Sequence, residues 1–313
     1  MHDASTSYQG AFAPPRRAIN APEQVEWRAV AYYVALAFGL AWLIEGIALA
    51  RGVSFAPLTV PGTAVLAAAM FTPAIAALIV RLTRKEGFAS AGLRLGPLKF
   101  YLAVWCAVPA LVILILGITI ALGLGTFDPS VSKLTELMRA YSNGRPLPPN
   151  LPSARVLASV MYLQTLTLGL LITTVATFGE EFGWTGYLLI KLLPLGRWRA
   201  AIIYGAIWGL WHAPVIIAGY NYPGHPYLGA PMMCLLTITF ALSQTALRLR
   251  SQSVLLTSFA HACLNSQGLG VLPMLVVGVS PVLGGVTGLV GIGVFGLVGA
   301  WLLSRSREAT RKT

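Results

Sequence analysis

The sequence predicts an all-α protein, a polytopic bundle of about eight transmembrane helices. Hydrophobic residues make up 56% of the 313 residues and charged residues only 10%, with a mean hydropathy of +0.73. Soluble globular chains do not reach such values. Apolar runs of about twenty residues recur along the chain, each long enough to cross a hydrocarbon core of roughly 30 Å. We expect these runs to be helices because a lipid-exposed open sheet would leave its edges unpaired.

Eight runs qualify as spans. In chain order they are Ala29–Ala50, Val60–Val80, Phe100–Leu124, Val156–Phe178, Ala200–Ala218, Leu228–Leu247, Val254–Leu272 and Val282–Leu303. The fourth run is expected to end close to the membrane interface, and Thr185–Leu193 to form an amphipathic or re-entrant piece near the cytoplasmic surface. In the longest loop, Val131–Tyr141 is expected to form a short surface helix.

The distribution of Lys and Arg predicts the orientation, because these residues gather in cytoplasmic loops. With eight spans and the N-terminus inside, seventeen of the 22 basic residues fall on the cytoplasmic side and five outside. Both termini are therefore expected in the cytoplasm. The net charge of +12 then reflects topology, and since the basic residues are spread over several short loops, no nucleic-acid partner is expected.

These expectations divide the chain into five parts. They are a cytoplasmic N-terminal tail (1–26), the first three spans (27–124), an extracytoplasmic loop (125–153), a transmembrane core (154–304) and a basic C-terminal tail (305–313).

Titratable side chains inside the core are the candidates for function, because such groups are costly at membrane depth. Glu180 and Glu181 follow the fourth run directly. His212 lies four residues after Trp208, and Asn265 lies four residues after His261, so each pair shares a helical face. Adjacent carboxylates diverge by about 100° on a helix and are expected to have different partners.

This inventory fits two kinds of hydrolytic site. In the first, Glu180 removes a proton from water that a histidine shares, and a second histidine with an amide stabilises the oxyanion. In the second, Glu180, His212 and His261 are the three ligands of an open zinc site, as in a metalloprotease. The residues leave both open. The lone carboxylate of the first span, Glu45, is expected to snorkel or to be hydrogen-bonded.

Three patterns in this order resemble the motifs EExxxR, FxxxH and HxxxN/D of the CPBP intramembrane proteases, the CAAX protease and bacteriocin-processing (Abi) family. They are Glu180-Glu181, Trp208 with His212, and His261 with Asn265, and the resemblance covers about residues 155–270. It implies a CPBP-like catalytic core within residues 154–304. In that core Glu180 would activate water, His212 would share that water, His261 and Asn265 would stabilise the oxyanion, and Glu181 would support them.

Two positions depart from the family patterns. Thr185 stands where the family has Arg, which removes the cation expected beside one carboxylate, and Trp208 stands in place of Phe.

The resemblance implies an intramembrane endopeptidase that hydrolyses peptide bonds of membrane-associated or lipidated protein and peptide substrates. The enzyme would be a multi-pass protein of the lipid bilayer, in the plasma membrane if its source is bacterial. Two alternatives stay open. One is a proton-coupled transporter, against which the absence of an inverted repeat counts. The other, kept open by Thr185, is an inactive relative that serves as a membrane scaffold or immunity protein.

Overall fold

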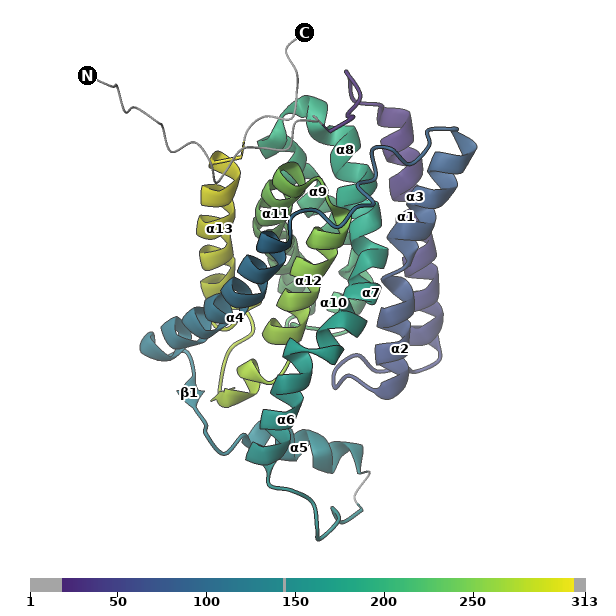
Figure 1. Ribbon diagram of the computed structural model, residues 1–313. Coiled ribbons are helices and arrows are strands. Elements are labelled where there is room, and N and C mark those ends of the chain that lie inside the picture. The colour runs from purple at the N-terminus through teal and green to yellow at the C-terminus, as the bar shows by residue number, and fades with distance from the viewer. Residues whose placement is uncertain (1–18, 143–144, 307–313) are drawn as a thin grey trace, which may run out of the picture.

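A computed structural model describes residues 19–142 and 145–306, and these residues are mostly helical (Figure 1). The predicted tails, 1–26 and 305–313, lie largely outside the described residues. The first half of the fold contains α1 (Trp27–Ala50), α2 (Val60–Ala69), α3 (Thr72–Thr83), α4 (Leu98–Ala121), β1 (Thr126–Phe127), α5 (Ser132–Tyr141) and α6 (Ala154–Leu166).

The second half carries the candidate site. It contains α7 (Leu168–Gly183), the π-helix η1 (Trp184–Leu188), α8 (Leu189–Leu192), the 3₁₀-helix η2 (Leu193–Leu195), α9 (Arg197–Trp211), α10 (Ala213–Ile217), α11 (Pro226–Ser251), α12 (Val254–Gly268), the 3₁₀-helix η3 (Leu272–Leu275), β2 (Val276–Val277) and α13 (Leu289–Ser304). The two short strands pair antiparallel, with Thr126 opposite Val277.

The predicted helical class is confirmed, and α5 forms at the predicted surface helix. Within the described ranges, four helices are long and apolar enough to cross a membrane, and a fifth is added if α6 and the helical run Leu168–Leu195 form one bent span. The bend is 52° and lies at Thr167. The short α12, with 15 residues, reaches about 22 Å at 1.5 Å per residue. The count of eight spans and the cytoplasmic termini stay predictions.

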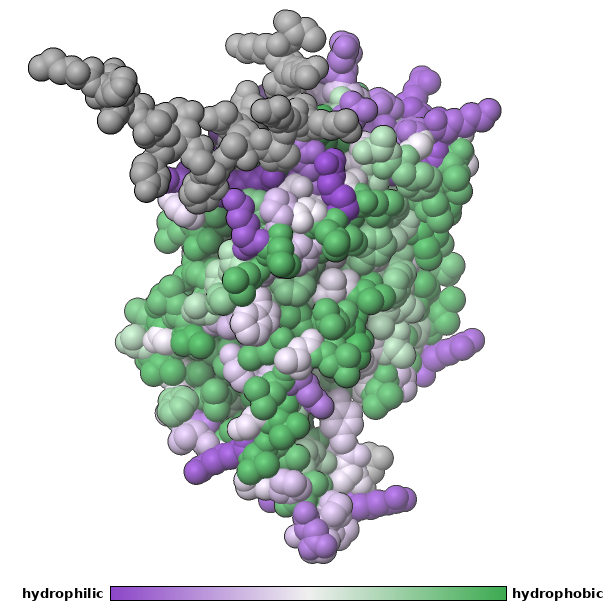
Figure 2. All heavy atoms as spheres, viewed as in Figure 1, coloured by the Kyte–Doolittle hydropathy of each residue, from purple (hydrophilic) through white to green (hydrophobic). Residues whose placement is uncertain are grey.

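The outer surface has the polarity of a membrane protein. Figure 2 shows apolar residues over the middle of the molecule, with polar residues gathered at its two ends. Large apolar side chains such as Leu98, Leu297 and Val60 are exposed by 80%, 77% and 71%. Because soluble proteins rarely expose such extended apolar surface, the chain is an integral membrane protein.

Helices α7, α9, α11 and α12 form the centre of the bundle. Helix α11 packs on α9 and α13, while α12 packs on α7 and α4. Helix α3 packs on α1 and on α7. The group α1 to α3 therefore lies on one side of the centre, and α13 lies on the opposite side (Figure 1).

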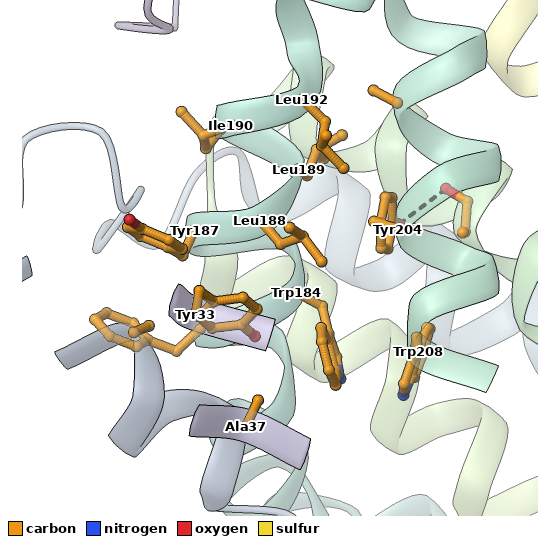
Figure 3. Close-up of a cluster of buried hydrophobic side chains, with 14 of the residues drawn as sticks. Tyr33, Ala37, Trp184, Tyr187, Leu188, Leu189, Ile190, Leu192, Tyr204 and Trp208 are labelled. Atoms are coloured by element: carbon orange, nitrogen blue, oxygen red, sulfur yellow. Dashed lines mark hydrogen bonds between the residues drawn. The ribbon is translucent and has the colours of Figure 1, made fainter. Parts of the chain in front are cut away.

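The segment after the carboxylates is fully packed inside the protein. Residues 184–193 are all buried and continue the helical run of α7 past Lys191, which pairs with Glu26 and Glu86. The position of this segment relative to the cytoplasmic surface stays a prediction. An aromatic cluster surrounds this run: Trp184 contacts Tyr33 and Trp208, with ring centroids 5.8 and 6.4 Å apart (Figure 3). The Thr185 hydroxyl is satisfied by Glu181 and by Thr257 of α12, and a reading of amphipathicity alone does not detect such partners.

Candidate active site

Glu180 and Glu181 lie in the last turn of α7, in the middle of the helical run and not at its end. Both are buried. Two glycines make this depth possible by letting the start of α3 approach closely. A Cβ at Gly179 would lie 2.6 Å from the carbonyl oxygen of Met70, and a Cβ at Gly183 would lie 2.5 Å from the Cβ of Pro73. The pattern Gly-Glu-Glu-Phe-Gly therefore places both carboxylates inside the bundle.

The π-helix η1 begins directly after this turn. Such widened turns are rare and frequently occur at functional sites. Two backbone carbonyls of η1 accept hydrogen bonds from guanidinium groups of other helices. Arg248 Nε of α11 donates to the Thr185 carbonyl at 3.2 Å, and a terminal nitrogen of Arg81 from α3 donates to the Gly186 carbonyl at 2.8 Å. Three helical segments, η1, α3 and α11, are thus joined beside the carboxylates.

The two carboxylates have different partners, as their helical spacing predicts. The Trp208 indole Nε1 of α9 donates to Glu180 Oε2 at 2.8 Å. Glu181 Oε1 lies 3.1 Å from Nδ1 of His261 on α12, and the Thr185 hydroxyl donates to Glu181 Oε2 at 2.9 Å. Glu180 is therefore linked to α9 and Glu181 to α12.

His212 lies at the break between α9 and α10, where Pro214 follows. Its Nδ1 is 2.9 Å from the carbonyl oxygen of Trp208. Because a carbonyl only accepts, Nδ1 carries a proton, and in the neutral ring Nε2 is the free acceptor. This hydrogen bond fixes both the orientation and the tautomer of the imidazole.

His261 is held by contacts on several sides. Its ring meets those of Trp208 and Phe240 edge to face, with centroids 5.1 and 5.8 Å away. The Nδ1 contact with Glu181 fixes the remaining direction. Asn265 follows one turn later on α12 and is partly exposed.

A cavity of about 110 Å³ brings the candidate residues together. Glu180, His212, His261 and Asn265 all line it, whereas Glu181 stands behind His261 and does not. The other walls are mostly apolar, and they come from α2, α10, α11, α12 and the segment before α13. A cavity of this size with several polar groups in its wall accommodates water, since one molecule occupies about 30 Å³ in the liquid.

Thr185, at the position of the family's Arg, forms a chain of hydroxyl groups in place of a cation. Its Oγ1 lies 2.8 Å from Oγ1 of Thr257 and donates to Glu181. Since each hydroxyl has one proton, the Thr257 proton is shared between Thr185 and the Val254 carbonyl, which lies 2.9 Å away. The charged partner of Glu181 is therefore His261, and the nearby guanidinium of Arg248 binds a backbone carbonyl instead.

The residues proposed as zinc ligands do not form a ligand set as arranged here. Within 19–142 and 145–306, no group of three or more His, Cys, Asp or Glu side chains is placed to hold a metal ion. Glu180 Oε2 and His261 Nδ1 are already engaged by Trp208 and Glu181. We therefore derive no step through a metal.

Sequence reasoning missed one residue of this cavity. Glu45 of α1 is 1% exposed and lines the cavity together with Glu180, so it does not snorkel. It stands 135 positions before Glu180 and belongs to no motif. Its one signal in the sequence is a carboxylate within an apolar span.

Residues 162–267 match the Rce1-like family, described as type II CAAX prenyl endopeptidase Rce1-like. The resemblance to the CPBP family is confirmed. The Rce1-like segment runs from α6 to α12 and contains all five predicted site residues, while α1 to α4 and α13 lie outside it. Among curated proteins, no significant match to the chain was found.

Proposed function

We propose that this protein is an intramembrane endopeptidase that uses a glutamate-activated water to cleave membrane-associated or lipidated protein substrates, as its Rce1-like segment suggests. The observation that carries the proposal is the shared cavity, in which Glu180 and His212 face the same buried space as His261 and Asn265. With eight spans and both termini in the cytoplasm, the cavity would be reached from the bilayer or from the cytoplasmic side.

In the proposed reaction, a water molecule binds between Glu180 and Nε2 of His212. Glu180 takes one proton from this water as the oxygen attacks the scissile carbonyl carbon. His212 accepts a hydrogen bond from the second proton of the water. This hydrogen bond orients a lone pair of the water oxygen toward the carbonyl carbon. The fixed Nδ1 contact with the Trp208 carbonyl supports this role because it leaves Nε2 as the acceptor.

The developing oxyanion is stabilised by His261 and Asn265. Since Nδ1 of His261 faces Glu181, Nε2 is the nitrogen available to the substrate, and an ion pair with Glu181 would keep a proton on both nitrogens. The Asn265 amide donates a second hydrogen bond. Preorganised donors of this kind typically contribute about 10²–10³ in rate each.

Glu181 acts through His261 and does not touch substrate. One oxygen of its carboxylate contacts Nδ1 of His261, and the other accepts a hydrogen bond from Thr185, whose hydroxyl contacts that of Thr257. Both oxygens are therefore oriented although the family's cation is absent. This argues for an active enzyme and against the inactive scaffold that Thr185 had kept open.

The test is cleavage of a panel of membrane-anchored and C-terminally lipidated peptides by the purified protein in detergent, with products identified by mass spectrometry. We expect wild-type cleavage that survives a metal chelator and is lost in His212→Ala. The matched control is Glu136→Gln, which changes an exposed carboxylate on α5. No cleavage of any peptide by folded protein would contradict the proposal, and proton-coupled flux in proteoliposomes would instead support a transporter.

A further inference from the structure

The cavity contains a second carboxyl group that no motif assigns. Glu45 of α1 lines it together with Glu180. Glu45 is almost completely buried, yet its Oε2 has no hydrogen-bond partner among the described residues. It lies outside the Rce1-like segment. A buried polar oxygen without a partner is uncommon and calls for an explanation.

The sequence of α1 holds Glu45 at this place. Ala41 and Ala48 are buried on the same side of the helix, and their small side chains let α1 pack closely against its neighbours. One turn before Glu45, the Trp42 indole donates to the carbonyl of Trp211 at 3.0 Å. Because Trp211 directly precedes His212, this contact fixes the C-terminal half of α1 against the break between α9 and α10.

Carboxyl groups outnumber cations around the cavity, because Glu45, Glu180 and Glu181 share at most one imidazolium, that of His261. His261 is paired with Glu181, and no Lys or Arg is among the described residues that line the cavity. The Trp208 indole stabilises Glu180, whereas Glu45 Oε2 has no donor. Two ionised carboxylates facing one enclosed space repel each other, and a buried carboxyl group without a donor favours its neutral form, so Glu45 is the better site for a retained proton.

We propose that Glu45 holds this proton and acts as the general acid that protonates the leaving nitrogen, a role that rests on the proposed function above. When the tetrahedral intermediate collapses, the carbon–nitrogen bond breaks and its electron pair stays on nitrogen. The nitrogen takes the proton of Glu45 and leaves as a neutral amine. Glu180, which took a proton from the attacking water, passes it to Glu45 through the cavity, so each turnover consumes one water molecule.

The other groups of the cavity are less suited to this step. The Nδ1 proton of His212 is held on the Trp208 carbonyl, and its Nε2 is an acceptor. His261 and Asn265 are assigned to the oxyanion. Glu45 comes from a different helix than the base, and its free oxygen needs no other bond to break before it donates.

The experiment compares two substrates that differ in the leaving-group atom of the scissile bond, nitrogen in one and sulfur in the other. One is a membrane-anchored peptide cleaved by the wild type, and the other is the same peptide with the scissile amide replaced by a thioester. A thiolate departs without a proton, since the pKa of a thiol is about 8.5, whereas an amine does not. A missing general acid therefore slows hydrolysis of the amide and not of the thioester.

For Glu45→Gln we expect amide hydrolysis to fall by about 100-fold or more while thioester hydrolysis stays within about threefold of wild type. Glu180→Gln should slow both substrates, and Glu136→Gln neither. Equal losses of Glu45→Gln on both substrates, or no loss on either, would overturn the role of Glu45. Wild-type protein that hydrolyses neither substrate would overturn the proposed function itself.

A second pair of variants keeps the test valid if Glu45→Gln does not fold. Glu45→Asp and Glu45→Asn have the same shape, but only the first contains an acid. The amide-to-thioester rate ratio should be at least about tenfold higher for Glu45→Asp. Equal ratios would contradict proton donation from this position.

Discussion

The hydrogen bond between Trp208 and Glu180 gives the sharpest energetic prediction. Trp208→Phe restores the residue found in the family pattern and keeps an aromatic ring against Phe240 and His261. It removes the indole N–H that lies 2.8 Å from Glu180 Oε2. The change therefore isolates one donor to the carboxylate proposed as the base.

The magnitude follows from the burial of both groups. Trp208 is 2% exposed and Glu180 is 3% exposed, so neither group is open to bulk solvent. A hydrogen bond to a charged group contributes about 1.5–3 kcal/mol to the free energy of unfolding. We expect Trp208→Phe to lower that free energy by about this amount, and to lower kcat because the carboxylate loses its fixed orientation.

The assay is a double-mutant cycle with Trp208→Phe and Glu180→Ala, measured by unfolding in mixed micelles of increasing SDS content. The two sites should be coupled by about 1.5–3 kcal/mol. Trp105→Phe is the control, because its indole donates to the Leu166 carbonyl at 3.0 Å on the surface, and kcat should not change. A coupling energy below about 0.5 kcal/mol would refute the proposed link between Trp208 and Glu180.

Three further predictions test the surroundings of the site. Thr185→Val, which removes the donor to Glu181, should lower the free energy of unfolding by about 1–3 kcal/mol and reduce kcat, while Thr185→Ser should restore both; equal behaviour of the two variants would contradict the hydroxyl chain. Gly179→Ala should lower the unfolding free energy by about 1–3 kcal/mol because its Cβ clashes with backbone, and an unchanged SDS midpoint would be inconsistent with the close packing. Burial raises the pKa of Glu26, but the cations of Lys191 and Arg84 lower it by more, so the pKa is lower in the folded state. The ionised Glu26 therefore stabilises the fold above the unfolded-state pKa, and this stabilisation is lost as pH falls through the folded-state pKa. Glu26→Gln should therefore lower the SDS midpoint at neutral pH by less than the equivalent of about 1 kcal/mol and should not lower it at about pH 3; an equal loss at both pH values would contradict the pairing.

The sequence predicted the local features of the site well. Adjacent Glu180 and Glu181 were expected to diverge, and they contact different helices. Trp208 and His212 were expected on one helical face, and their rings do lie side by side, with centroids 6.3 Å apart. Such features depend on spacing along one helix, which a single sequence contains in full.

Features that depend on packing between distant segments were not predicted. Glu45 reaches the cavity from α1, and nothing in its neighbourhood distinguishes it from a snorkelling carboxylate. The sequence shows that Thr185 is not Arg, but not that Thr257 supplies a hydroxyl or that Arg248 comes from α11. The burial of residues 184–193 likewise depends on neighbours that the local apolar pattern does not reveal.

The central claim is that Glu180 activates the attacking water, and the rate of peptide cleavage by Glu180→Gln tests it most directly. Gln keeps the size of the side chain and its contact with Trp208, so the fold and the binding of an uncleavable substrate analogue should be retained. The account predicts a loss of kcat of about 10²–10⁴-fold relative to wild type and Glu136→Gln. Cleavage by Glu180→Gln within about tenfold of wild type would contradict the assignment of Glu180 as the general base.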